Sequence, residues 1–294
     1  MSKNHTASAG PSPEFLEMLK LIEPIQLFDD YYYVGCRLVG FHLLKTSEGL
    51  VLFDSGDDWE SAWERILLPG LRKLGLENEK LCMLLLTHGH FDHYLGAVDV
   101  QKKTGVPVAL SERDTGYMLW ADENMPPKPQ AVPRITRILT PGETLTFGDH
   151  TVEVLDGSGH TPGCLNYAYT VHDKGVPHTA VMMGGYGVFG PGHYEGGVPY
   201  PYSAEWAVDQ ALKFASTAVK LWDYAKEHKA DVYFNPHPQL CDLVEHDREN
   251  KAHPEGPNAH IIGLEGVRKW IVNRFDCAIA YTQEFTDIQK PVEG

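Results

Sequence analysis

The feature that most constrains this chain is an apolar run that ends in a cluster of metal-binding side chains. Three leucines lead into residues 87–93, whose sequence is THGHFDH. Strand side chains alternate between two faces, so these polar groups cannot converge while the strand continues. A loop at the strand end can bring His88, His90, Asp92 and His93 to one point. Imidazole and carboxylate are ligands that Zn²⁺ prefers, so the pattern predicts a metal site rather than a polar turn.

Two further histidines follow predicted strands. His160 stands in a turn rich in Gly and Pro, residues 156–163, directly after an apolar segment. His237 lies between two prolines after the predicted strand at 231–234. Each alone is more typical of an ordinary turn. Together with the four groups of residues 87–93 they supply six ligands, which is enough for two adjacent metal ions.

The rest of the chain alternates between strand-like and helix-like stretches. Short β-branched and aromatic runs bounded by Gly and Pro predict strands, and longer segments with helical spacing follow them. Residues 186–202 are rich in Gly, Tyr and Pro and predict a loop that overhangs a pocket as an aromatic wall. The order predicts a mixed α/β fold. Helices are expected at 59–74, 97–104, 111–120, 203–229 and 264–281.

Composition places the chain among ordinary soluble proteins. Of its 294 residues, 43% are hydrophobic and 22% are charged, and no apolar run is long enough for a membrane span. Residues 1–20 are polar and lack the apolar core of a secretion signal, so we expect a flexible lead before one domain at 21–294. Five scattered cysteines, never in a C-x-x-C pair, indicate a reducing cytoplasm. The mature form of an exported protein remains the alternative.

The net charge of the chain argues against some classes of binding partner. Forty acidic and 25 basic residues give a net charge of −15, and no Lys/Arg cluster offsets it. Such a field repels phosphate backbones. The sequence therefore predicts a small-molecule substrate, with neither nucleic acid nor a membrane as partner. It leaves the oligomeric state open.

Three motifs resemble the metallo-β-lactamase superfamily: residues 87–93, residues 158–163, and the Asp54-Ser55-Gly56 turn. The resemblance extends from about residue 25 to 285. It implies a four-layer αβ/βα sandwich with the site at one edge of two facing sheets, and a buried Asp54 that orders the metal loop. It also implies two zinc ions per chain. The implied ligands are His88, His90 and His160 for the first zinc, and Asp92, His93 and His237 for the second.

The sequence differs from many members of the family at one position, directly after a predicted strand. The predicted strand at 179–183 runs into Gly184, Gly185 and Tyr186, with no Asp or Cys to bridge the metals. The resulting ligand set is most similar to subclass B3 metallo-β-lactamases, which usually carry a Ser near Gly185. We expect the missing hydroxyl to widen the pocket and to leave only modest β-lactam turnover, which Gly185→Ser would raise. The native substrate would then be a different acyl compound.

Metal chemistry predicts the reaction class. Two zinc ions lower the pKa of a shared water from 15.7 toward about 7, which supplies a bridging hydroxide, and Asp92 orients it as the catalytic carboxylate. The predicted activity is opening of a lactam, lactone or similar acyl bond. The alternative is hydrolysis of another ester or thioester, as in lactonases or glyoxalases. A diiron redox enzyme would have Glu at His90 and a flavin partner domain, and phosphodiesterases usually have the bridging Asp. A non-catalytic metal-binding module would have lost ligands, yet all six remain.

Overall fold

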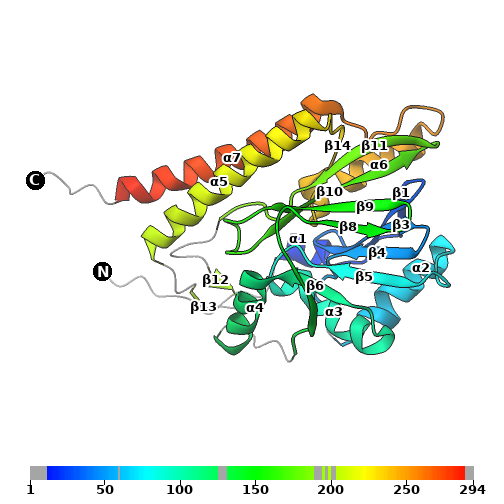
Figure 1. Cartoon of the computed structure of the whole chain (residues 1–294), viewed down its shortest axis with the longest axis horizontal. Helices are drawn as coiled ribbons and strands as arrows, with labels where there is room; N and C mark the ends of the chain where they lie inside the picture. Colours follow the sequence, from blue (N-terminus) through cyan, green and yellow to red (C-terminus); the bar gives the residue numbers. More distant parts are fainter. Residues whose placement is uncertain are drawn as a thin grey trace, which may run out of the picture.

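The fold is that of a computed structural model, which describes residues 12–58, 60–124, 131–188, 194–195, 198–199 and 203–288. Two mixed β-sheets face each other, and helices cover their outer sides (Figure 1). This confirms the predicted αβ/βα sandwich. The largest group of buried side chains lies between the two sheets and includes Tyr31, Phe53, Tyr167 and Phe234.

The first sheet contains seven strands in chain order. Its first four strands form an antiparallel meander, and the next three continue in parallel. Parallel neighbours need crossover connections, and helices supply them on the outer face. The strands are β1 (Ile25–Phe28), β2 (Tyr31–Gly35), β3 (Gly40–Thr46), β4 (Gly49–Phe53), β5 (Leu81–Leu85), β6 (Val108–Ser111) and β7 (Ile135–Leu139).

The second sheet has the order β14-β11-β10-β9-β8, and only the β11–β14 pair is parallel. A separate two-stranded ladder pairs β12 (Tyr194–Glu195) with β13 (Val198–Pro199). The strands of the second sheet are β8 (Thr144–Phe147), β9 (His150–Asp156), β10 (Leu165–Asp173), β11 (Val176–Met182) and β14 (Val232–Phe234).

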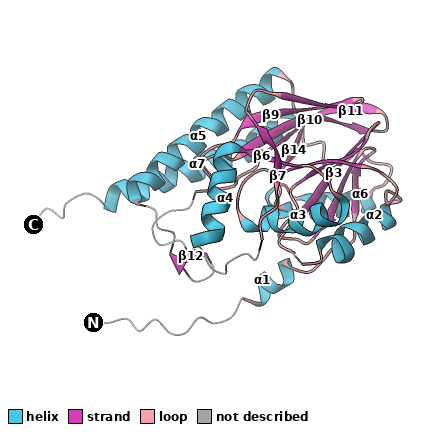
Figure 2. Ribbon diagram, turned by 60° about the horizontal axis from the view of Figure 1, so that its bottom comes forward, coloured by secondary structure: helices cyan, strands magenta, loops and turns pink. Residues whose placement is uncertain are grey.

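Helices on the first sheet enclose a second apolar core, with Leu52, Leu86 and Val100 among its members. The long helices α5 and α7 run side by side over the second sheet (Figures 1 and 2). None of the helices in the described ranges has the length and apolarity needed to cross a membrane. The helices are α1 (Pro13–Met18), the π-helix η1 (Trp63–Leu67), α2 (Leu68–Leu74), α3 (Phe91–Thr104), α4 (Glu112–Asn124), α5 (Ala204–Glu227), the 3-10 helix η2 (Pro238–Leu240), α6 (Leu243–Ala252) and α7 (Gly263–Ile288).

Two segments differ from what the sequence predicts. The helix expected to begin near Ala97 begins at Phe91, with His90 as its N-cap, so that prediction is wrong. An acidic side chain in a first helical turn is stabilised by the helix dipole, which favours helix at Asp92. Of the expected flexible lead, Pro13–Met18 form α1, and residues 1–11 lie outside the described residues. Most of the Tyr-rich stretch at 186–202 lies outside them as well.

Candidate metal centre

Six side chains meet at one edge of the sandwich, where several strands end. His88 and His90 follow β5, His160 follows β9, and His237 follows β14. Asp92 and His93 occupy the first turn of α3. The structure brings all six predicted residues together as two groups, in each of which the donor atoms lie within 4.8 Å of one another. The first group is His88, His90 and His160, and the second group is Asp92, His93 and His237.

Donor distances in both groups fit a tetrahedral ion. The Nε2 atoms of His88 and His160 are 3.2 Å apart, as are those of His93 and His237. Asp92 Oδ2 lies 3.5 Å from His93 Nε2 and 3.8 Å from His237 Nε2. Two nitrogens each about 2.05 Å from a tetrahedral zinc would be about 3.3 Å apart. The donor set and its spacing therefore suit zinc.

Four of the histidines have their Nδ1 atoms held by a hydrogen-bond partner. Nδ1 of His160 donates to the Gly187 carbonyl at 2.8 Å, and Nδ1 of His237 donates to the Leu38 carbonyl at 2.8 Å. His93 Nδ1 lies 2.7 Å from Asp54 Oδ2, and His88 Nδ1 lies 2.9 Å from Thr87 Oγ1. Such partners fix ring orientation and tautomer in metal sites. Each ring consequently presents Nε2 to its group.

Asp54 connects the metal-binding loop to the sheet. Its carboxylate is fully buried and accepts from Thr87 N and Thr87 Oγ1, both at 2.7 Å, as well as contacting His93. Since the Thr87 hydroxyl proton goes to Asp54, its oxygen is free to accept the Nδ1 proton of His88. Asp54 adopts a φ of 52°, an unusual value for a residue other than glycine. These contacts are those expected of the residue that orders the loop.

Burial keeps most histidines of the two groups in the neutral form, which is the form that binds metal. Desolvation lowers the pKa of His160 to about 3 and that of His237 to about 4, and it lowers the pKa of His88 well below 6.5. His93 differs. Burial acts to lower its pKa as well, but the carboxylates of Asp92 and Asp54 raise it above 6.5. Protons therefore compete with a metal ion mainly in the second group.

We expect the second group to lose its metal before the first group as pH falls. Because the pKa of His93 is raised, its proton competes with the metal at higher pH than that of His160, whose pKa is lowered to about 3. Metal content after equilibration at stepped pH should fall in two steps. The Asp92→Asn variant should lack the upper step. A single step in the wild type, or the same two steps in the variant, would contradict the assignment.

Two buried polar residues of the site carry no sequence signal of their role. Asp114 on α4 accepts from Gly89 N at 2.8 Å, Thr161 Oγ1 at 2.5 Å and Gly163 N at 2.6 Å, which ties the two histidine loops together. Burial raises its pKa to about 6 despite these donors. Asn235 accepts from His237 N at 3.0 Å and donates to the Met183 carbonyl at 2.8 Å. Neither residue lies in a recognisable motif.

The expectation that Gly185 leaves open space is wrong. A Cβ atom placed on Gly185 would lie 2.3 Å from Cβ and 2.6 Å from Cγ of His160. The side chain of His160 therefore occupies the space that we expected to be empty beside Gly185. The ring of the next residue, Tyr186, contacts one histidine of each group, with its centroid 5.3 Å from His160 and 5.0 Å from His237. Gly185 is required for this packing rather than being a vacant position.

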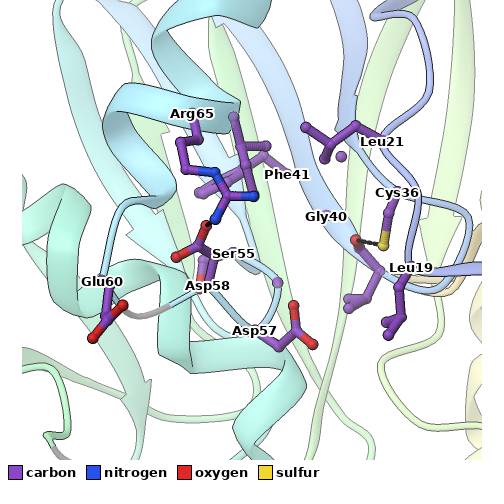
Figure 3. A pocket seen from close by; sticks show the side chains of 14 residues that line it. Leu19, Leu21, Cys36, Gly40, Phe41, Ser55, Asp57, Asp58, Glu60 and Arg65 are labelled. Carbon is purple, nitrogen blue, oxygen red and sulfur yellow. Dashed lines mark hydrogen bonds and ion pairs between the residues drawn. The ribbon is translucent and has the colours of Figure 1, made fainter. Parts of the chain in front are cut away.

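A cavity of about 310 Å³ lies between the turn that joins β2 to β3 and the loop after β4, and none of its lining residues belongs to either group (Figure 3). Its wall includes Ser55, whose hydroxyl donates to the His93 carbonyl at 2.8 Å. Arg65 pairs with Asp58 at 3.1 Å, while Asp57 lies apart from both (Figure 3). Burial and the nearby charge of Asp92 raise the pKa of Asp57. The lining is therefore acidic on one side, with Leu19, Leu21 and Phe41 as its apolar part.

Comparison with proteins of known sequence identifies relatives among hydrolases. The profile of the metallo-beta-lactamase superfamily matches residues 37–173. A hydroxyacylglutathione hydrolase of Acidiphilium cryptum is 31% identical over 90 residues, which is 31% of this chain and 31% of that protein. The hydroxyacylglutathione hydrolase GloC of Haemophilus influenzae is 32% identical over 127 residues, 39% of this chain and 58% of that protein. The chain thus matches less than two thirds of either relative.

Comparison with solved structures covers nearly the whole chain. The subclass B3 metallo-beta-lactamase BJP-1 of Bradyrhizobium japonicum superposes with a TM-score of 0.76 at 24% identity, over 94% of this chain and 99% of that one. The FEZ-1 metallo-beta-lactamase of Legionella gormanii gives 0.74 at 21% identity, over 93% and 99%. At these identities the likeness establishes the fold. This likeness agrees with the superfamily profile, which matches residues 37–173, a segment that contains five of the six residues of the two groups.

Proposed function

We propose that this protein is a dinuclear zinc hydrolase that cleaves the acyl bond of a small molecule, a lactam, a lactone or a related ester. The observation that carries the proposal is the pair of adjacent donor groups, in which four imidazoles are held with Nε2 facing inward. Such preorganisation holds reacting groups in place at no cost during the reaction.

The bound ions would supply an activated water, with a pKa lowered toward about 7, and a Lewis acid for the scissile carbonyl. The chain's own contribution is orientation. Asp92 has an 18% exposed side chain, whereas those of His93 and His237 are 0% and 4% exposed. Its carboxylate is thus the group of this trio that reaches solvent and can accept a hydrogen bond from the attacking water. The Tyr186 ring packs against one histidine of each group.

A second candidate substrate is a glutathione thioester. It is favoured by both sequence relatives described above, which are named hydroxyacylglutathione hydrolases, whereas the lactamases match in fold. The chemistry at the carbonyl is the same for a thioester and a lactam. The two candidates differ in what surrounds the scissile bond, so they are separated by substrate preference.

A substrate panel with metal depletion tests the proposal. Chelator-treated protein should be inactive, and added zinc should restore hydrolysis of at least one of a lactam, a lactone and a glutathione thioester. The class with the highest kcat/KM identifies the substrate. Failure of zinc-loaded, folded protein to hydrolyse any of them would refute the proposal. Recovery with iron but not zinc would favour redox chemistry instead.

We expect the acidic cavity wall to discriminate against anionic substrates. Replacing Asp57 with Asn should raise kcat/KM for a carboxylate-bearing substrate by about 2–5-fold, because it removes a like charge, and the repulsion between two unit charges in water is at most about 1 kcal/mol at contact distances of roughly 4 Å. A neutral ester should be unaffected, and added salt should reduce the gain. Glu60→Gln, at an exposed acid of the same wall, should give a smaller gain, because solvent screens its charge more strongly. Equal gains for charged and neutral substrates would contradict an electrostatic origin.

The cytoplasmic location, the single domain at 21–294 and the absence of nucleic-acid or membrane partners stay proposals that rest on composition and charge.

A further inference from the structure

A third group of metal-binding side chains lies at the other end of the sandwich. Asp30 stands in the turn between β1 and β2, His150 begins β9, and His172 is near the end of β10. One donor atom from each lies within 4.8 Å of the other two. His160 of the first group follows the opposite end of β9, which is about 20 Å away for six strand steps. The third group is therefore separate from the first and second groups.

Two imidazole nitrogens in this group face a single carboxylate oxygen. Asp30 Oδ2 lies 2.5 Å from His172 Nδ1 and 3.0 Å from His150 Nε2. The other oxygen, Oδ1, is occupied because it accepts from the His172 backbone N–H at 2.9 Å. Two nitrogens and one carboxylate oxygen form a donor set that suits zinc and other divalent transition metals.

The ring of His150 is held as a metal ligand would be. Its Nδ1 lies 2.8 Å from the Asp149 carboxylate, and that carboxylate also accepts from Ser47 N at 2.8 Å. A carboxylate behind a histidine fixes its orientation in many metal sites. The His150 side chain is 6% exposed and the Asp30 side chain 13%, whereas the His172 side chain is 35% exposed. His172 can therefore shift outward by the few tenths of an ångström that an ion requires, and solvent can complete the coordination.

We propose that Asp30, His150 and His172 form a third site that binds a divalent transition metal ion and joins the two sheets. Asp30 lies in a turn that joins two strands of the first sheet, and both histidines lie on strands of the second sheet, so the ion crosslinks the two halves of the sandwich. Its role is structural, because the site lies far from the six residues of the metal centre. The inference does not depend on the proposed hydrolase activity.

Zinc stoichiometry of the full chain tests this site. Chelator-stripped protein is dialysed against buffered low-micromolar zinc, and bound zinc is counted in the wild type and in His172→Gln. We expect the variant to bind one zinc fewer per chain. It should also show a smaller rise in Tm on zinc addition, while keeping its hydrolytic activity. His178→Gln is the matched control, because His178 is also a half-buried histidine on an aspartate, 2.6 Å from Asp231. It should bind as much zinc as the wild type.

Equal zinc content in the wild type and His172→Gln would overturn the proposal. Asp30, His150 and His172 would then form a hydrogen-bonded cluster that binds no metal. The difference between the two proteins is decisive even if the catalytic groups bind no zinc, so failure here is distinct from failure of the proposed function. His150→Gln should reproduce the loss. If that variant does not fold, His172→Gln decides alone, because its side chain is partly exposed.

Discussion

Replacing Asp92 with Asn should lower kcat at least about 100-fold, the range found when a catalytic or charge-stabilising group is lost. Asparagine keeps the size of the side chain but removes the charge that faces His93 and His237 at 3.5 and 3.8 Å. It therefore weakens the second group and loses the acceptor that orients the attacking water. The measurement is kcat on the best substrate of the panel, with bound zinc counted in the same preparation.

A control separates this loss from general damage. Asp209→Asn removes an exposed aspartate of α5 that pairs with Lys213 and should leave kcat and Tm unchanged. The Asp92→Asn variant should have a near wild-type Tm in the metal-free state, since its side chain is partly exposed. Near wild-type turnover by this variant would rule out the assigned role.

Replacing Gly185 with Ser should abolish binding at the first group and lower kcat/KM by at least about 100-fold. The new Cβ would lie 2.3 Å from His160 Cβ, which is not the mobile end of a side chain. The ring cannot move away freely, because its Nδ1 is bonded to the Gly187 carbonyl and Tyr186 packs against it. A shift of His160 by several tenths of an ångström would move its Nε2 atom out of line with that of His88. Misplacements on this scale, up to about 1 Å, can lower the rate by about 100-fold.

Gly187→Ser is the matched variant for this experiment. A Cβ on Gly187 meets nothing within 4 Å, although its carbonyl also belongs to the site. We expect that variant to retain both zinc binding and activity. Higher β-lactam turnover by Gly185→Ser would show that His160 relaxes at little cost and would restore the view of Gly185 as a missing hydroxyl.

The convergence of the six candidate ligands could be predicted from the sequence, because four of them follow recognisable strands. Strand ends collect at the edge of a sheet, so polar groups placed there converge whatever the details of packing. The start of α3 was harder to predict. Asp92 and His93 read as loop residues, yet they occupy a first helical turn whose cap is His90.

The hydrogen bonds that hold the ligand side chains in place could not be predicted, because many of their acceptors are backbone carbonyls, which no residue type marks in the sequence. His160 and His237 are held by the carbonyls of Gly187 and Leu38, and any residue has a carbonyl. Asp114 is 46 positions from His160 in the chain and reads as an ordinary acid of a helical first turn. The effect of Gly185 likewise depends on a contact with His160 that only the folded chain creates.

The central claim is that the six residues hold two adjacent zinc ions. Anomalous diffraction at the zinc edge, from crystals of the zinc-loaded protein, tests it most directly. We predict two anomalous peaks at the edge of the sandwich where the six side chains meet. One zinc ion should be bound by His88, His90 and His160, and the other by Asp92, His93 and His237. Absence of both peaks from a folded, zinc-loaded crystal would contradict the account.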